Sequence, residues 1–115
     1  MRVLILEDNG ERVLQFMRNL MEHTVVITTN SSECISLLQN GVWDVLYLDH
    51  DLGGQQMVES GLGTGQEVTK WLKENSDFKP KAVILHSANP DGVKAMRFDI
   101  PDAIVVPFAW TQKLS

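Results

Sequence analysis

The sequence predicts a doubly wound α/β fold, in which helices cover both faces of a parallel sheet. Short apolar runs without polar alternation recur along the chain, and such runs are typical of strands that are buried on both sides. Between these runs lie segments with apolar residues at helical spacing. Strands that alternate with helices form right-handed crossovers, so the two observations together predict a parallel sheet.

The composition is that of one ordinary globular domain, which we expect to span residues 1–115. The chain is 43% hydrophobic and 22% charged, and it is long enough to bury a core. Its net charge of −5 argues against electrostatic binding of an extended nucleic-acid backbone. Binding of a small phosphate-containing ligand through a metal remains possible. The single Cys34 excludes an internal disulfide, and no apolar run reaches membrane-spanning length. We therefore expect a cytoplasmic protein without a membrane segment.

The first half of the chain predicts three strands and two helices. Arg2–Leu6 is an apolar strand, and residues 13–21 place apolar side chains at helical spacing. Thr24–Thr29 is β-branched throughout, which favours a strand. Residues 30–38 open with an Asn and, three positions later, a Glu, a pair that resembles the capping box of a helix. Trp43–Asp49 is the third strand, an apolar run that ends abruptly in a carboxylate.

The second half predicts a long loop, two strands and two helices. Residues 53–65 hold five of the eight glycines and should form the loop. Gln66–Asn75 carries an apolar helical face, and Lys81–Ser87 is the fourth strand. Asn and Pro at the start of residues 89–98 suit the cap and first turn of a short helix. Ala103–Val106 is the fifth strand.

Acidic residues follow the first and third strands at the same end of the sheet. Glu7 and Asp8 end the first strand, while Asp49 and Asp51 end the third. In open α/β sheets ligands bind at this carboxyl edge. Clustered carboxylates repel one another and are held together by a hard cation, so we expect a Mg²⁺ or Mn²⁺ site here. The alternative is that each carboxylate is a solvated strand-end residue.

Two histidines and a glycine-rich segment add further candidates. His50 lies between two carboxylates and His86 directly precedes Ser87. Imidazole suits a general acid at neutral pH, so either histidine could protonate a leaving oxygen. The alternative is that His86 bonds a neighbour and His50 is a solvated loop residue. Gly63 and Gly65 precede a helix and could cradle phosphate on their amides, although the segment lacks the Lys-Ser/Thr of a P-loop.

The five βα units with their acidic strand ends resemble the receiver domain of two-component response regulators. We therefore expect a flavodoxin-like sheet with strand order 2-1-3-4-5. The resemblance implies that Glu7, Asp8 and Asp49 bind Mg²⁺ with help from the backbone carbonyl of Asp51. It also implies that Ser87 contacts a phosphoryl oxygen.

The resemblance to receivers has one clear departure near the fifth strand. Receivers carry a Lys just before the Pro of that strand, whereas this chain has Val106 before Pro107 and Phe108. That Lys neutralises the phosphoryl group, so its loss argues against ordinary phosphorylation of Asp49. Lys94 or Lys113 could substitute, but nothing in the sequence places them at the site. Little chain follows for a fifth helix, and we expect a fold truncated after strand five.

Three segments resemble a narrower branch, the cyclic-phosphate processing receiver domains. They are the Leu-Asp-His-Asp-Leu-Gly run at 48–53, the Gly-Thr-Gly at 63–65 and the His-Ser-Ala-Asn-Pro-Asp-Gly at 86–92. The resemblance implies action on a cyclic phosphate rather than reception of a signal. The catalytic candidates are Asp49, His50, His86 and Ser87. The candidate phosphate-binding positions are Gly63, Gly65, Ser87, Ala88 and Asn89.

Two classes of function stay open. One is a metal-dependent phosphoesterase that binds or hydrolyses a cyclic phosphate ester, such as a cyclic nucleotide or an RNA terminus. The other is a receiver in phosphorelay signalling, phosphorylated on Asp49, or a degenerate pseudo-receiver that serves as an interaction module for a protein partner. The absent Lys and the two histidines favour the first class, whereas the acidic residues and Ser87 suit both.

Overall fold

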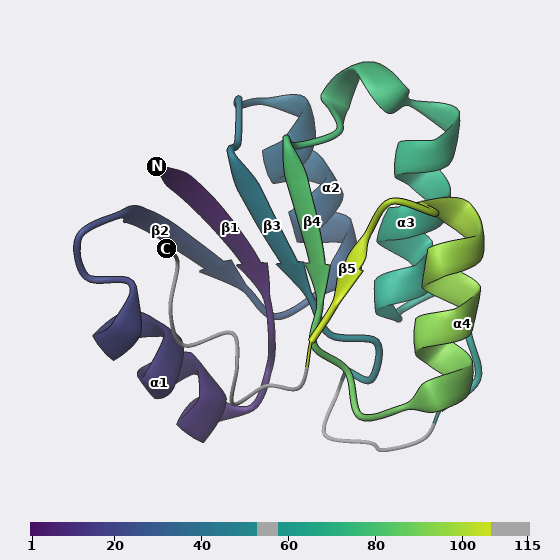
Figure 1. Cartoon of the computed structure of the whole chain (residues 1–115), viewed down its shortest axis with the longest axis horizontal. Helices are drawn as coiled ribbons and strands as arrows, with labels where there is room; N and C mark the ends of the chain where they lie inside the picture. The colour runs from purple at the N-terminus through teal and green to yellow at the C-terminus, as the bar shows by residue number, and fades with distance from the viewer. Residues whose placement is uncertain (53–57, 107–115) are drawn as a thin grey trace.

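The computed structural model describes residues 1–52 and 58–106 and confirms the predicted flavodoxin-like topology (Figure 1). Five parallel strands form one sheet in the order β2-β1-β3-β4-β5. The strands are β1 (Arg2–Leu6), β2 (Thr24–Thr28), β3 (Val45–Leu48), β4 (Ala82–Leu85) and β5 (Ile104–Val105). The helices are α1 (Gly10–Asn19), α2 (Ser31–Gln39), α3 (Gly65–Glu74), α4 (Pro90–Asp99) and the short 3₁₀ helix η1 (Ser76–Phe78). None of these described helices is long and apolar enough to cross a membrane.

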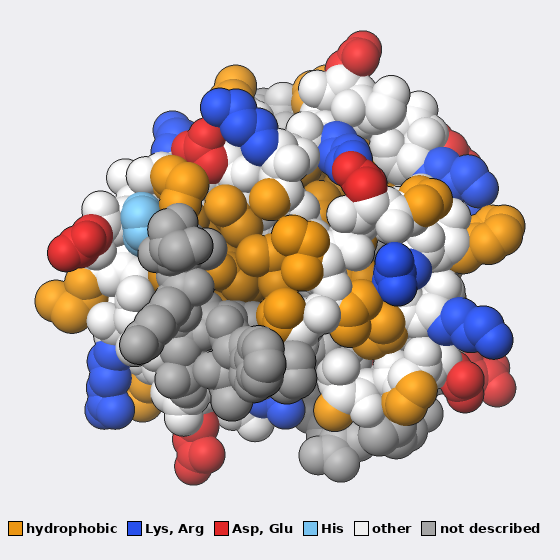
Figure 2. Space-filling model, viewed as in Figure 1, with side chains coloured by type: hydrophobic (Ala, Val, Ile, Leu, Met, Phe, Trp, Pro, Cys, Tyr) orange, Lys and Arg blue, Asp and Glu red, His pale blue; other side chains and the backbone are white. Residues whose placement is uncertain are grey.

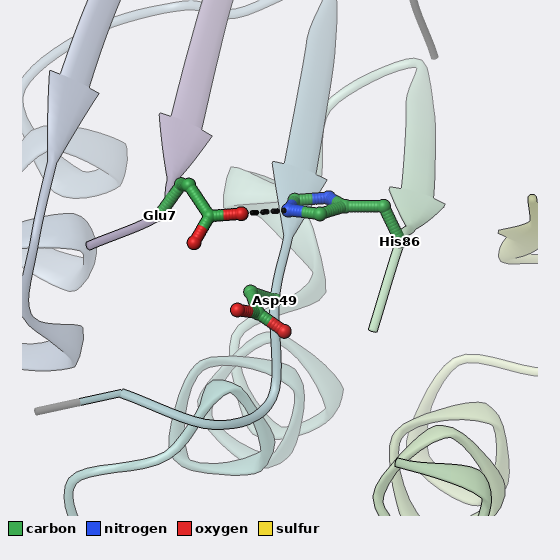
Figure 3. Close-up of side chains that lie close together, drawn as sticks. All are labelled: Glu7, Asp49 and His86. Atoms are coloured by element: carbon green, nitrogen blue, oxygen red, sulfur yellow. Dashed lines mark hydrogen bonds and ion pairs between the residues drawn. The ribbon is translucent and has the colours of Figure 1, made fainter. Parts of the chain in front are cut away.

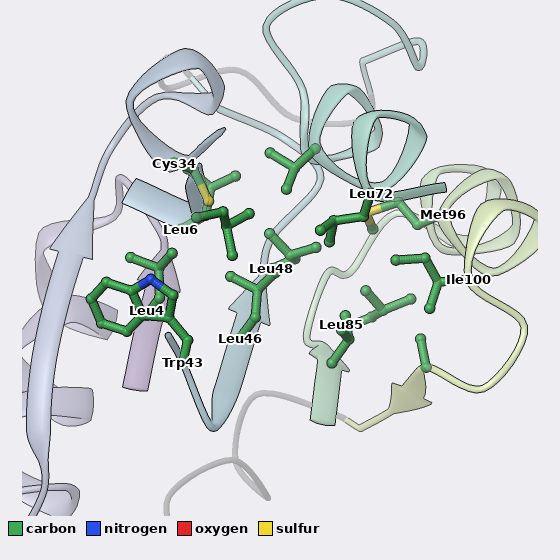
Figure 4. Close-up of a cluster of buried hydrophobic side chains, with 14 of the residues drawn as sticks. Leu4, Leu6, Cys34, Trp43, Leu46, Leu48, Leu72, Leu85, Met96 and Ile100 are labelled. Carbon is green, nitrogen blue, oxygen red and sulfur yellow. The ribbon is translucent and has the colours of Figure 1, made fainter. Parts of the chain in front are cut away.

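One face of the sheet packs against α2, α3 and α4 (Figure 4). Alternate residues of the three central strands point to this face, as the two-residue period of a strand requires. The contributing side chains are Leu4, Leu6, Leu46, Leu48 and Leu85 from the strands and Cys34, Leu38, Leu72 and Met96 from the helices. Each of these is 1% exposed or less. A fully buried Leu contributes about 1.5–3 kcal/mol, so this layer supplies much of the driving force for folding.

The opposite face is covered, within the described chain, by α1. Phe16 and Leu20 of that helix pack on the intervening strand residues Val3, Ile5 and Tyr47. The strand residues Val25, Ile27, Ala82 and Ile84 on this face are only partly buried, and apolar side chains gather over its middle (Figure 2). The two faces are therefore covered unequally.

The strand β1 has its predicted bounds, whereas β2, β3, β4 and β5 are shorter than predicted at one or both ends. Asp49 was expected within the third strand, but β3 ends at Leu48. The backbone amide of Asp49 still donates a hydrogen bond to the Leu6 carbonyl at 3.1 Å. Helix α1 begins before the expected residue 13, since the side chain of Asn9 caps it by accepting from the Arg12 amide. The predicted glycines at 53 and 54, Pro107, Phe108 and the truncation after them lie outside the described residues.

Polar caps start all four α-helices near the carboxyl ends of the strands. The predicted cap Asn30 accepts from the Glu33 amide at 2.8 Å, and the predicted cap Asn89 accepts from the Gly92 amide at 3.0 Å. Thr64 caps α3 in the same way. Such caps satisfy helix amides that would otherwise lack partners. They fix the loops that surround the carboxyl edge of the sheet.

We predict that Gly65→Ala destabilises the fold whereas Gly10→Ala does not. Both glycines are the first residue of a helix, but a Cβ at Gly65 would overlap the backbone carbonyl of Asp49, while a Cβ at Gly10 meets nothing within 4 Å. Overpacking of this kind costs about 1–3 kcal/mol, and Ala at an open helix position gains up to about 1 kcal/mol. Urea unfolding of the two variants measures the difference. Equal stability would contradict the close packing of α3 on the end of β3.

Candidate functional site

The register of the sheet brings three strand-end residues together. Leu6, Leu48 and Leu85 are aligned on neighbouring strands, so the next residue of each strand lies in one row. These next residues are Glu7, Asp49 and His86 (Figure 3). Because side chains alternate along a strand, they turn away from the leucine layer. One ligand atom from each residue lies within 4.8 Å of the others.

The three side chains are buried and accept or donate hydrogen bonds within the chain. Nε2 of His86 lies 3.1 Å from Oε1 of Glu7, and it donates because a carboxylate can only accept. Oε2 of Glu7 accepts from the backbone amides of Asp8 and Asn9, each at 3.1 Å. Oδ1 of Asp49 accepts from the amide that follows it at 2.8 Å. Glu7 is 0% exposed and Asp49 5%, so backbone amides and the imidazole replace most of the lost water.

Arg12 is the basic side chain that the structure places beside this acidic group. Its Nη1 lies 3.5 Å from Oε1 of Glu7 and 3.7 Å from Oδ2 of Asp49, and about one third of the side chain (32%) is exposed. Arg12 was not among the site residues predicted from the sequence. A signal existed, because a cation in the first turn of a helix opposes the helix dipole and needs a compensating anion.

Burial sets the protonation of the group. Desolvation, together with the negative charge of Glu7, raises the pKa of Asp49 to about 7, although Arg12 acts in the opposite direction. Burial also favours the neutral form of Glu7, but the hydrogen bond from His86 and the amide of Asn9 outweigh it and hold the pKa of Glu7 below its ordinary value. Burial lowers the pKa of His86, with partial compensation from Glu7. At neutral pH the site therefore holds an ionised Glu7, a neutral imidazole and an Asp49 that readily exchanges its proton.

The donor set fits a divalent cation. Two buried carboxylates converge at this edge of the sheet, and burial together with the charge of Glu7 disfavours the ionised form of Asp49 by raising its pKa. Carboxylate oxygens suit Mg²⁺ and Mn²⁺, and an imidazole nitrogen is tolerated better by Mn²⁺. Asp8 is half-exposed and is not part of the three-residue group, so its role as a ligand stays a prediction.

His50 lies elsewhere than expected. The interpretation as a solvated loop residue is wrong, because its side chain is 0% exposed. Nδ1 lies 2.7 Å from Oδ1 of Asp51, and Nε2 lies 2.8 Å from Oγ of Ser60. The Asp51 carboxylate is thus hydrogen-bonded to His50. That the backbone carbonyl of Asp51 binds the metal stays a prediction. Nothing in the sequence indicated Ser60, since only the path of the loop brings it to His50.

The candidate phosphate-binding positions lie around the same edge, but most of their polar groups have acceptors or donors within the chain. The amide of Gly63 donates to Oε1 of Glu67 at 2.8 Å, and that of Gly65 donates to the His50 carbonyl at 3.0 Å. Oγ of the half-buried Ser87 accepts from the amide of Asn89 at 3.1 Å. The two glycine amides are therefore engaged in shaping the loop. Ser87, the exposed Ala88 and Asn89 stay predictions.

Position 106 lies beside the site, as the resemblance to receivers implies. The amide of Val106 donates to the carbonyl of Leu85 at 3.0 Å, one residue before His86. The apolar side chain cannot supply the charge of the receiver Lys. Lys94 lies on α4 among Pro90 and Val93, and Lys113 is outside the described residues. Among the ion pairs of the described chain, Arg12 supplies the cation at Glu7 and Asp49.

Solved structures with a similar fold include response regulators. The Mn²⁺-bound form of response regulator Rcp1 superposes with a TM-score of 0.75 at 19% identity, covering 96% of this chain and 88% of that one. The phosphorylated cyanobacterial phytochrome response regulator RcpA gives 0.76 at 18% identity, covering 96% and 85%. TrrA from Thermotoga maritima, in complex with Mg²⁺ and BeF, gives 0.69 at 19% identity, covering 95% and 89%. These identities establish the shared fold.

The sequence itself places the chain within a narrower group. A search of curated proteins finds no match. The family model of the cyclic-phosphate processing receiver domain matches residues 2–100, which include both acidic strand ends and the segment from His86 to Gly92. The chain is thus a receiver domain of the response-regulator type, and it belongs to the family of cyclic-phosphate processing receiver domains.

Proposed function

We propose that this domain binds a divalent cation in the crevice and acts on the phosphoryl group of a cyclic phosphate ester. The observation that carries the proposal is the buried group of Glu7, Asp49 and His86, whose ligand atoms lie within 4.8 Å of one another. The family to which the chain belongs supports the choice of a cyclic phosphate. A cyclic nucleotide or an RNA terminus presents such a group.

Glu7 and Asp49 would hold the cation, with Asp8 and the backbone of Asp51 as further candidates. Rcp1 with Mn²⁺ and TrrA with Mg²⁺ support this, because both share the fold. Bound there, a cation neutralises the carboxylates and polarises a phosphoryl oxygen. The buried Asp49 provides a reason for binding, since its charge lacks compensation without the metal.

Arg12 would bind the phosphoryl oxygens. Its guanidinium reaches both carboxylates and is partly exposed, so it can turn toward a ligand without leaving the site. Guanidinium groups bind phosphate with two parallel hydrogen bonds. In this way Arg12 supplies the positive charge that Val106 does not.

His86 is the candidate acid for the departing ester oxygen. Its hydrogen bond to Glu7 fixes the ring in the crevice. Burial disfavours the imidazolium form, so a reaction that needs this proton should be faster at acid pH. His50 is less suited to this role, because both of its ring nitrogens are engaged with Asp51 and Ser60.

The second candidate function is a receiver that accepts a phosphoryl group on Asp49 and signals to a protein partner. The fold shared with phosphorylated RcpA and the position of Asp49 at the crevice favour it. Val106 argues against it, because an apolar residue lies where receivers carry their Lys. The two functions require the same metal and differ in what becomes of the phosphoryl group.

We predict that Asp49→Asn weakens Mn²⁺ and Mg²⁺ binding. Loss of a ligand carboxylate should raise the dissociation constant by at least about 10–100-fold, because even outer partners of a metal are worth that much. Isothermal titration of the parent and the variant measures the change. Asp77→Asn, at an exposed position in η1, is the matched control and should bind as the parent does. Unchanged affinity in Asp49→Asn would exclude the proposed site.

We predict that the ionisation of Asp49 removes stability from the metal-free protein as the pH rises from about 4 to about 7. The pKa of Asp49 rises from 3.8 to about 7 on folding, so the folded state keeps a proton that the unfolded state releases in this window. At about 1.4 kcal/mol per pKa unit the loss is at most about 4 kcal/mol. Asp49→Asn should lack this contribution, so its free energy of unfolding should increase relative to that of the parent as the pH rises. Urea unfolding in EDTA at both ends of the window tests this, and parallel pH profiles would contradict it.

We predict that the domain hydrolyses at least one cyclic phosphate when Mn²⁺ or Mg²⁺ is present. The screen compares cyclic mononucleotides, cyclic dinucleotides and RNA with a cyclic phosphate end, and mass spectrometry detects the opened product. Asp49→Asn should lower turnover by at least about 100-fold, while Asp77→Asn leaves it unchanged. No turnover, combined with a saturable change in tryptophan fluorescence on adding beryllofluoride and Mg²⁺, would favour the phosphoacceptor instead.

A further inference from the structure

A second group of polar side chains lies next to the acidic crevice and has no role in the proposed function. Oγ of Ser60 lies 2.8 Å from Nε2 of His50, and Nδ1 of the same ring lies 2.7 Å from Oδ1 of Asp51. With Nδ1–H donating to the carboxylate, Nε2 accepts from the serine hydroxyl. The three groups are thus hydrogen-bonded in the same order as in the catalytic triad of a serine hydrolase, which is hydroxyl, imidazole and carboxylate.

The surrounding structure holds the imidazole and the carboxylate in place. Nδ2 of Asn89 donates to Oδ1 of Asp51 and to the carbonyl of Val58, both at 3.0 Å. The backbone of Gly92 packs on the ring of His50 so closely that a Cβ would overlap it. The imidazole therefore cannot tilt away from Asp51. Fixed partners of this kind keep a catalytic base in one tautomer and orientation.

The residues of this group differ in solvent exposure, and a nucleophile must be accessible to its substrate. Ser60 is exposed, whereas His50 is fully buried. A hydroxyl that only tied down its loop would need no charged group behind the imidazole. Here the serine belongs to an exposed residue, the imidazole is fully buried, and the side chain of Asp51 is 12% exposed.

We propose that Ser60 is a nucleophile, activated by His50 and Asp51, that accepts the acyl group of an uncharged carboxylic ester. Oγ attacks the ester carbonyl carbon and its proton passes to Nε2 of His50. The C–O bond to the alkoxy group then breaks, and the leaving group takes that proton and departs as an alcohol. Water, attacking with the same imidazole as base, releases the acid and restores the hydroxyl.

The charges near Ser60 favour an uncharged substrate. Glu59 precedes it in the chain, Asp51 lies behind the imidazole, and the carboxylate of Glu67 binds the Gly63 amide three residues farther on. An anionic phosphodiester would be repelled by these groups, while a neutral ester would not. The proposed activity is thus distinct from the metal-dependent reaction of the crevice.

Acetylation by p-nitrophenyl acetate tests the proposal in the parent protein. The reaction is run in EDTA and quenched early, and peptide mass spectrometry compares acetyl groups on Ser60 and Ser32. Ser32 is the matched control, since it is also exposed but donates to the side-chain amide oxygen of Asn30 instead of a base. General-base catalysis predicts that Ser60 reacts about 10²–10⁴-fold faster than Ser32. Equal rates would show that the Ser60 hydrogen bond is structural and overturn the proposal.

Variants assign the roles within the group. Ser60→Ala should abolish the fast release of p-nitrophenolate, whereas Ser32→Ala should leave it unchanged. Asp51→Asn should slow Ser60 acetylation toward the Ser32 rate, and a thermal melt verifies that this variant is folded. Full reactivity in folded Asp51→Asn would remove the carboxylate from the mechanism. Faster reaction of Ser60 with bis(p-nitrophenyl) phosphate than with the acetate ester would overturn the choice of substrate. Because EDTA is present, the outcome is independent of the metal site.

Discussion

The burial of two carboxylates at neighbouring strand ends is the constraint on which the site depends. Glu7 and Asp49 cannot turn to water, because the register of β1 and β3 fixes them beside each other under α1. Each must be compensated locally, and the chain supplies backbone amides, His86 and Arg12 for this purpose. The compensation is incomplete at Asp49, and a cation would complete it.

Consecutive residues after β3 serve two different groups. Asp49 faces Glu7 and His86, whereas His50 is buried beneath the first turn of α4, against Gly92. The carboxylate of Asp51 is then hydrogen-bonded to the ring of His50 and to the side-chain amide of Asn89. The chain bends at His50, so the side chains of one short run reach both places. The metal crevice and the serine group therefore share a backbone but no side chain.

The strand pattern made the fold predictable, because apolar runs buried on both faces admit few other architectures. The same pattern predicted that Glu7 and Asp49 converge, since both follow a strand directly. The environment of His50 was not predictable, as it depends on the packing of α4 and on the path of the loop to Ser60. Arg12 was also missed, although its place in the first turn of a helix, where a cation opposes the helix dipole, indicated a nearby anion.

The central claim is that a divalent cation binds between Glu7 and Asp49, and NMR of the imidazole nitrogens with trace Mn²⁺ tests it most directly. His86 lies within the group, while His23 lies at the other end of the sheet, where its Nδ1 is 3.3 Å from the N-terminal amine. Paramagnetic broadening falls steeply with distance, so the His86 signals should disappear first and those of His23 should persist. Broadening of His23 before His86, or of all three histidines equally, would contradict the account.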